Sequence, residues 1–276
     1  MSVLTVTKST IPGYVSQRNA SFPNQVIMLT WRSLVTIFRT PAAVIPTLII
    51  SAFFLFVYNA SLGNASNFLP GLAGKSYLGF ILPVSVVSAA LSGAGVAGQS
   101  IVRDIENGYF DKLLLTPVSR GALLIGPIVA GALVLGLQTG IVVIIGLFMG
   151  LDPQTGVAGL AAVMGYALLL GTGFAGFTVA IALRSGNAAA TQGATFLFFP
   201  LTFLTATFVP VDLLSGWIKT AAEYNPITYI LEAMRSLLLS GWEGDALLKG
   251  FIACGILGTF TFIFALSSLR GRTKRK

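Results

Sequence analysis

Histidine is absent from this chain, and cysteine occurs once, at Cys254. These absences exclude an intrachain disulfide, a zinc site built on spaced Cys and His ligands, and acid–base chemistry that needs an imidazole. Cys254 lies in an apolar run and is interpreted as an inert, small hydrophobic side chain. The catalytic and metal-binding chemistries that depend on these two residue types are therefore not expected.

Charge is also scarce, because 9% of the residues are charged and 55% are hydrophobic. A soluble domain has about a quarter of its residues charged. The net charge is +8, but the basic residues flank apolar runs and form no surface stripe, which argues against nucleic acid and favours membrane lipid. No apolar segment of signal-peptide type occurs in the first twenty residues, so no cleaved leader is expected. The composition excludes a soluble enzyme.

Six stretches of at least 20 residues contain no charged side chain. About 20 apolar residues in a helix cross a bilayer core of about 30 Å. We therefore predict an all-α, polytopic membrane protein with six transmembrane helices in a single domain. The predicted spans are 43–60, 77–101, 121–147, 156–182, 188–209 and 250–269.

Lysine and arginine beside these spans predict the orientation of the chain in the membrane. Thirteen of them lie on one side, and four lie on the other. Because basic residues favour the cytoplasm, both termini are expected to be cytoplasmic in a multi-pass protein of the plasma or inner membrane. The four predicted outside are Lys75, Lys219, Arg235 and Lys249.

Residues 23–39 have the spacing of an amphipathic helix that lies on the membrane surface. Pro23 suits the first turn, and Pro41 ends the helix. An unstructured arm is the alternative. The apolar face would consist of Ile27, Trp31, Leu34, Val35 and Phe38.

The loop after the second span reads RDIENGYFDKLLLTPVSR and predicts a short cytoplasmic helix at 103–115. Its acidic residues lie early and Lys112 lies late, as the helix dipole favours. Charged faces on a short helix between two spans indicate docking on another protein, and a solvated loop is the alternative. The charges offered are Arg103, Asp104, Glu106, Asp111, Lys112 and Arg120.

The stretch 211–249 is too long for a tight turn and too polar for a span. Asn225 and Pro226 form a good cap and first turn, and an apolar stripe follows them. Glu232 and Arg235 stand three apart off the stripe, at a spacing that allows them to pair. We predict two short helices, near 211–222 and 226–240, that dip into the outer leaflet as a re-entrant element covered by other helices.

Two kinds of motif that resemble nucleotide-binding sequences are rejected. GLAGKS at 71–76 lacks the first glycine of a phosphate loop, because position 69 is Leu69. The GxGxxG strings at 93–98 and 171–176 fall inside predicted spans, where close helix packing explains them better than a dinucleotide. The chain is expected to bind no cofactor.

No Asp, Glu, Lys, Arg or His occurs in the six predicted spans. Ion-driven pumps and carriers usually keep ionisable residues there, so coupling through a membrane carboxylate is not expected. If the protein transports actively, its energy must come from a partner, and the cytoplasmic helix is the expected contact. A non-transporting assembly or anchoring subunit and an ion-driven carrier or channel are the alternatives.

Three features resemble the permease subunit of a type-2 ABC exporter, of the ABC-2 family. The first is the surface helix, and the second is the charged segment closing in LLLTPVSR at 113–120, with Glu106 and Gly108 upstream, which is similar to the family's coupling helix. The third is the outer segment, with Pro210, Trp217 and NPITYILEAMR at 225–235. The branch resembling daunorubicin permeases fits best, because no large outer domain interrupts the chain.

The resemblance implies a half-transporter. Two six-span permeases, identical or homologous, would each rest on a separate P-loop ATPase, so that two ATPase copies hold the ATP and Mg. The cargo implied is hydrophobic or amphiphilic: a drug, a lipid or a glycolipid. The second and fifth spans would line its pathway, with Phe196, Phe199 and Phe203 as lining candidates. Coupling would use the segment of Arg103 to Arg120, and the outer motif would consist of Trp217, Asn225, Pro226, Glu232 and Arg235.

Overall fold

The computed structural model describes residues 21–63, 76–205, 207 and 210–274, and all regular structure within these ranges is helical. Most of the GLAGKS string and residues 208–209 lie outside the described residues.

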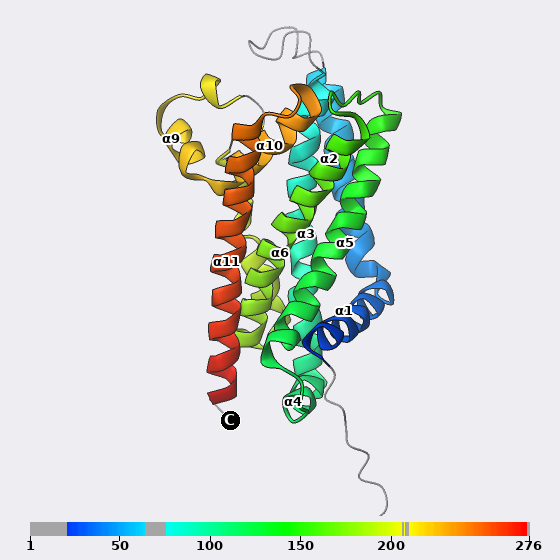
Figure 1. The fold of residues 1–276 in the computed structure, drawn as a ribbon, viewed down its shortest axis with the longest axis vertical. Coiled ribbons are helices and arrows are strands. Elements are labelled where there is room, and N and C mark those ends of the chain that lie inside the picture. Colours follow the sequence, from blue (N-terminus) through cyan, green and yellow to red (C-terminus); the bar gives the residue numbers. More distant parts are fainter. Residues whose placement is uncertain (1–20, 64–75, 206, 208–209, 275–276) are drawn as a thin grey trace, which may run out of the picture.

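Five helices in the described ranges are long and apolar enough to cross a membrane. They lie side by side, with α3 between α2, α5 and α6, and with α11 against α6 (Figure 1). Their middle parts carry no Asp, Glu, Lys, Arg or His, so they are compatible with hydrocarbon. They are α2 (Pro41–Leu62), α3 (Tyr77–Glu106), α5 (Arg120–Phe148), α6 (Gly156–Ser185) and α11 (Gly244–Lys274).

The stretch 188–209, predicted as the fifth of six spans, is not one continuous helix. It contains α7 (Ala188–Thr195) and α8 (Phe198–Phe203), and each is too short to cross a bilayer alone. The prediction of a single span helix is therefore wrong for this segment, and a sixth crossing stays a prediction.

Pro200 explains the break between α7 and α8. A proline has no N–H, and its ring collides with the carbonyl four residues earlier, here that of Phe196. The chain turns at that point, where the N–H of Phe196 bonds to the oxygen of Gly193 at 3.1 Å. Apolar composition alone does not report this break, because every residue around it suits hydrocarbon.

Helix α1 (Phe22–Phe38) crosses the bundle near one end and packs against α5 (Figure 1). Its buried side contains Thr30, whose hydroxyl donates to the Gly126 oxygen at 3.2 Å. The opposite side exposes large apolar groups, among them Ile27 (64% exposed) and Trp31 (69%). An apolar face turned away from the protein is typical of a helix on a membrane surface.

The predicted helix at 103–115 is divided in the structure. Helix α3 continues from its span through Glu106, and α4 (Tyr109–Leu114) begins after a turn at Asn107 and Gly108. Gly108 has φ 65°, a left-handed conformation that glycine adopts without steric cost. The glycine ends α3 here, because side chains rarely adopt the conformation that the turn needs.

At the opposite end of the bundle, α9 (Gly216–Tyr224) and α10 (Pro226–Leu239) follow a 3-10 turn, η2 (Val211–Leu213). Helix α10 packs on α3, α6 and α11 and is buried along most of its length, whereas α9 stands aside (Figure 1). The two predicted short helices are thus present. Their depth in the membrane stays a prediction.

Small residues bring the long helices into close contact. A Cβ on Gly98 of α3 would lie 2.9 Å from the carbonyl oxygen of Thr178 in α6. A Cβ on Gly131 of α5 would lie 2.9 Å from the Cβ of Ala97, and one on Gly176 would lie 3.0 Å from the Thr261 hydroxyl of α11. The glycine-rich strings therefore serve helix packing, which is the main driving force between helices in lipid.

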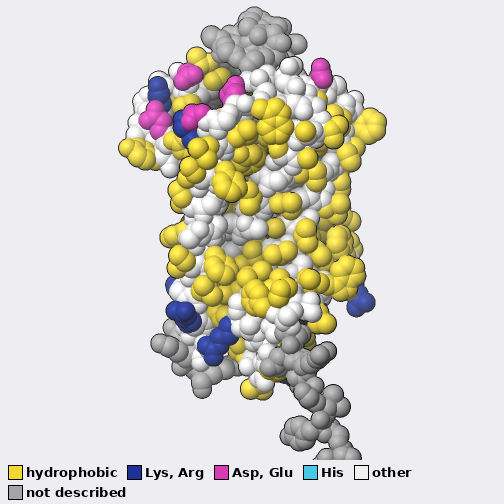
Figure 2. All heavy atoms as spheres, in the orientation of Figure 1, with side chains coloured by type: hydrophobic (Ala, Val, Ile, Leu, Met, Phe, Trp, Pro, Cys, Tyr) yellow, Lys and Arg dark blue, Asp and Glu magenta, His cyan; other side chains and the backbone are white. Residues whose placement is uncertain are grey.

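Charge separates along the bundle. Figure 2 shows acidic side chains gathered at the end with α9 and α10, several basic side chains at the other end, and a hydrophobic band between them. We call the first end the α10 end and the second the α4 end. This arrangement agrees with the excess of lysine and arginine on one side of the spans predicted from the sequence.

Replacing Gly98 by alanine is expected to lower the thermal midpoint of the purified protein, with a cost of about 1–3 kcal/mol, because the Thr178 backbone blocks the new methyl group. Gly165 of α6 is the matched control, since a Cβ there meets nothing within 4 Å. Gly165→Ala should leave the midpoint unchanged or raise it. Equal midpoints for the two variants would contradict the packing role of Gly98.

Candidate coupling site, pockets and outer cap

A bidentate ion pair joins α1 to α3 at the α4 end. Arg32 donates from Nη1 to Asp104 Oδ2 at 2.8 Å and from Nη2 to Oδ1 at 2.5 Å. The guanidinium carbon also lies 3.9 Å from the ring centroid of Tyr109, the first residue of α4. The hydrogen bond that Arg32 donates to Asp104 raises the pKa of Arg32 above its ordinary value, although partial burial opposes it. Arg32, a residue of α1, thus binds both α3 and α4.

Helix α4 is fixed to the bundle by its apolar side. Phe110 is 1% exposed and packs with Ile101 and Val102 of α3 and with Leu269 of α11. The opposite side of the segment is open to solvent, and Leu115 at its end is 88% exposed. Helix α4 and its exposed end therefore form a tip that is held to the bundle by its apolar side.

The predicted coupling charges divide into two groups. Glu106, Lys112 and Arg120 are exposed at the tip, and Asp111 is half-buried beside them. Asp104 is engaged by Arg32, and Arg103 turns toward the interior of the bundle. The tip therefore offers a mixed-charge surface, while Asp104 and Arg103 make contacts within the chain.

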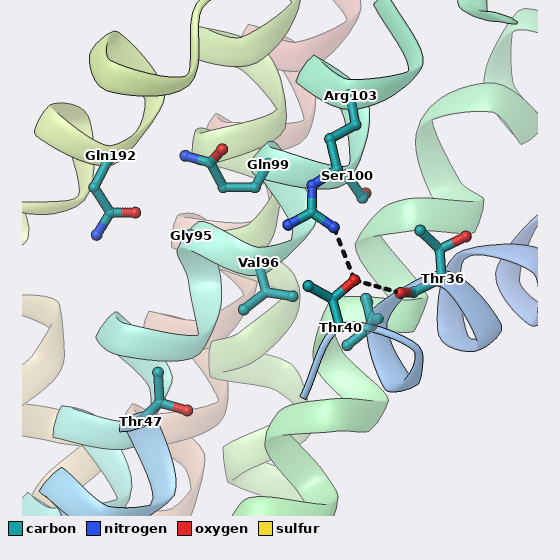
Figure 3. A pocket seen from close by; sticks show the side chains of 10 residues that line it. Thr36, Thr40, Thr47, Gly95, Val96, Gln99, Ser100, Arg103 and Gln192 are labelled. Carbon is teal, nitrogen blue, oxygen red and sulfur yellow. Dashed lines mark hydrogen bonds between the residues drawn. The ribbon is translucent and has the colours of Figure 1, made fainter. Parts of the chain in front are cut away.

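Arg103 lines a pocket of about 220 Å³ between α1, α2, α3 and α7, which we call the polar pocket (Figure 3). Its Nη1 donates to the Thr40 hydroxyl at 3.0 Å, and that hydroxyl donates to the Thr36 oxygen at 3.1 Å. Gln99 extends toward α7, where its amide donates to the Ala188 oxygen at 2.9 Å (Figure 3). The other lining residues are Ile37, Thr47, Gly95, Val96, Ser100 and Gln192.

A second pocket of about 380 Å³ lies between α2, α3 and the α7–α8 segment, and we call it the apolar pocket. Phe196 and Phe203, predicted to line a pathway, are among its lining residues. The side chain of Phe199 lies outside the described parts of the structure. Thr47 and Gln192 line both pockets, so the two adjoin.

Asn225 connects two helix ends at the α10 end. Its Oδ1 accepts from the Ile227 N–H at 3.0 Å, which caps α10. Its amide nitrogen donates to the oxygens of Leu201 and Leu204 at 2.6 and 2.9 Å. Those carbonyls lie where α8 ends and lack helical partners there. Pro226, which has no N–H, occupies the first turn of α10, where no donor is needed.

Arg235 does not form the predicted pair with Glu232, because no ion pair joins them within the described residues. Its Nε donates to the Phe80 oxygen of α3, and its Nη2 donates to the Thr207 oxygen, both at 3.0 Å. The guanidinium also lies 3.5 Å from the centre of the Phe80 ring. Burial lowers the pKa of Arg235 to about 9 and raises that of Glu232. Arg235 thus joins α10 to α3 and to the segment after α8.

Trp217 belongs to α9 and is 70% exposed, away from the Asn225 and Arg235 contacts. An exposed tryptophan at the end of a hydrophobic band suits a membrane interface. The outer motif therefore divides into a buried cap and an exposed aromatic.

Comparison with known proteins agrees with this architecture. The family model described as ABC-2 type transporter matches residues 24–239, which runs from α1 to the last residue of α10. The chain belongs to the ABC-2 type transporter family. The matched range includes the ion pair of α1 with α3, both pockets and the Asn225 cap.

Curated relatives within the ABC-2 family cover most of this chain. It is 25% identical over 220 residues to a probable doxorubicin resistance ABC transporter permease, DrrC, of Mycobacterium tuberculosis, covering 80% of this chain and 79% of the relative. It is 23% identical over 233 residues to the daunorubicin resistance permease DrrB1 of Streptomyces coeruleorubidus, covering 83% and 81%. It is 23% identical to the putative transport permease ycf38 of Cyanophora paradoxa, covering 78% and 74%.

Sequence reasoning placed Arg32 only off the apolar face of its helix and did not predict its partner. The two residues of the ion pair are 72 positions apart, so no local spacing connects them. The inward turn of Arg103 was missed for the same reason, because Thr40 lies 63 positions away. In an ABC-2 permease, a search for charges of opposite sign near the ends of different helices is the signal that would have suggested the pair.

The Arg32–Asp104 pair is expected to contribute about 1 kcal/mol of coupling in a double-mutant cycle, because it is bidentate but partly exposed. Thermal unfolding of Arg32→Ala, Asp104→Ala and the double variant measures it. Arg32→Lys should lose most of the coupling, since an ammonium cannot reproduce the planar fork. Strictly additive losses in the cycle would contradict an interaction between the two residues.

Asn225→Asp should destabilise the protein at least as much as Asn225→Ala, by roughly 2 kcal/mol. Aspartate is a good N-cap, but here its carboxylate would face the two carbonyl oxygens that the amide now binds. Asn187 is the control, because it caps α7 as an acceptor from Ala190 and is exposed. Asn187→Asp should leave the thermal midpoint nearly unchanged, and a tolerated Asn225→Asp would disprove the bridging role.

Proposed function

We propose that this chain is the permease subunit of an ATP-driven exporter of a hydrophobic or amphiphilic substrate: a drug, a lipid or a glycolipid. Two such permeases, identical or homologous, form the membrane unit, and each rests on a P-loop ATPase that holds ATP and Mg. The permease itself is a transport subunit and has no catalytic role. It lies in the plasma or inner membrane with both termini in the cytoplasm.

The connection of α1, α3 and α4 at the α4 end is the observation that carries this proposal. Arg32 links α1, α3 and α4, so that force applied to α4 reaches two other helices through one side chain. Exposed Glu106, Lys112 and Leu115 provide charge and an apolar group for a protein partner. We infer that α4 and its flanking turn form the coupling element.

The middle of the bundle supports an external energy source. No Asp, Glu, Lys, Arg or His lies in the central parts of the five long helices, so a proton or ion has no carboxylate or basic side chain to bind there. The similarity to doxorubicin and daunorubicin resistance permeases supports export as the direction. The basic side chains at the α4 end support a cytoplasmic position for that end.

Glu106→Lys should lower both the amount of ATPase that co-purifies with the tagged permease and the ATP hydrolysis of the complex, by about tenfold or more, because it reverses a charge at the docking tip. The control is Glu223→Lys, an equal charge change on exposed α9 at the other end of the bundle. It should change neither quantity. Solute movement by the purified permease alone, with no ATPase present, would overturn the proposal.

A further inference from the structure

The polar pocket contains one cation and no anion. Arg103 is the only charged residue among its described lining residues. Its Nη1 donates to the neutral Thr40 hydroxyl, and no carboxylate among the described residues lies within ion-pair distance of it. Arg103 is half-buried, so its charge is less screened than on an open surface. The electrostatics of this pocket favour a negatively charged ligand.

The hydrogen-bond donors that remain free in this pocket are nitrogen atoms. Each lining hydroxyl already donates to a backbone carbonyl three or four residues earlier in the chain. These hydroxyls belong to Thr36, Thr40, Thr47 and Ser100. The guanidinium of Arg103 keeps further N–H groups, and Gln192 has no hydrogen-bond partner among the described residues. These donors suit the oxygen atoms of a phosphate, a sulfate or a carboxylate.

The apolar pocket borders the polar pocket that Arg103 lines. Thr47 and Gln192 form the border, and Gln138 holds Thr47 in place by a hydrogen bond of 2.6 Å. Beyond the border, the lining is mostly hydrocarbon and aromatic, with Pro46, Ile50, Phe54, Leu91, Phe196 and Phe203. The pocket that holds the cation therefore borders a larger apolar pocket.

We propose that the two pockets form one site for an amphiphile with an anionic head group and an apolar body. Arg103 binds the head near the α4 end, and Phe196 and Phe203 contact the body deeper in the bundle. The assignment of this amphiphile as the cargo rests on the proposed function, whereas its binding does not. Within the proposed drug, lipid and glycolipid range, the site selects molecules that carry negative charge.

The test uses the purified full chain in nanodiscs of zwitterionic phosphatidylcholine, without an ATPase. Three fluorescent probes share one dodecyl chain and carry a phosphate, a phosphocholine or a trimethylammonium head. Fluorescence titration should give a dissociation constant for the phosphate probe about tenfold or more below that of the trimethylammonium probe. Equal affinities for the three probes would overturn the inference.

Arg103→Gln should lower the affinity for the phosphate probe about tenfold and leave the affinity for the trimethylammonium probe unchanged or higher. Arg103→Lys should keep most of the preference for the phosphate probe. The control is Arg39→Gln, which removes the same charge from an exposed position outside both pockets. It should alter none of the affinities. A loss shared equally by all probes in Arg103→Gln would indicate a structural role and contradict head-group binding.

Phe203→Ser should lower the affinity for all three probes by the same factor, about fivefold, because it removes a contact with the dodecyl chain and none with the head group. Phe260→Ser on α11, where the ring is 66% exposed and outside both pockets, is the control and should have no effect. A change in head-group preference in Phe203→Ser would contradict the division of the site.

Co-purification and transport measurements distinguish a failure of this inference from a failure of the proposed function. If the phosphate probe binds as expected but no ATPase co-purifies, the proposed function fails and the site stands. If ATP-dependent transport occurs without head-group preference, the site inference fails and the function stands. A phosphate probe that binds selectively but is never moved by the ATPase complex would overturn its assignment as cargo.

Discussion

The hydrocarbon of a bilayer contains no water, so every backbone polar group placed there needs a partner within the protein. The long helices meet this requirement internally, but the stretch after α7 does not, because Pro200 interrupts it. Asn225 and Arg235 supply the missing donors, with bonds to the oxygens of Leu201, Leu204 and Thr207. Side chains at the start of α10 and within it thus satisfy carbonyl groups of the irregular segment.

Helix α3 connects the regions where polar chemistry is concentrated. Near its start, the Phe80 oxygen accepts from Arg235, and near its end Asp104 binds Arg32. Between them, Gly98 brings the helix against α6, and Arg103 faces the polar pocket. Helix α3 has 30 residues and is about 45 Å long, so it reaches from the α10 end to the α4 end. The α4 tip, the pockets and the outer cap thus share one element.

The sequence predicted most elements because their signals are local. Charge-free stretches located five long helices, and Pro41 correctly ended the surface helix before them. The Asn-Pro pair correctly started α10. Prediction failed where the cause was a neighbour in space or one residue in an apolar run. Pro200 broke an expected helix without changing its hydropathy, and Gly108 divided the expected coupling helix. Glu232 was a plausible local partner for Arg235, but backbone carbonyls of other segments took its place.

By itself, the sequence determined that the chain is a helical membrane protein, because composition, charge-free stretches and capping residues act within a few turns of helix. Its likeness to the ABC-2 family rests on the surface helix and on the motifs at 113–120 and 225–235. Only the tertiary structure decided which charges are exposed and which bind other parts of the chain. Arg103 and Asp104 are adjacent in sequence, yet one lines a pocket and the other binds α1. Successive residues on a helix point in different directions, and what they meet depends on helices 63 and 72 positions away in the chain.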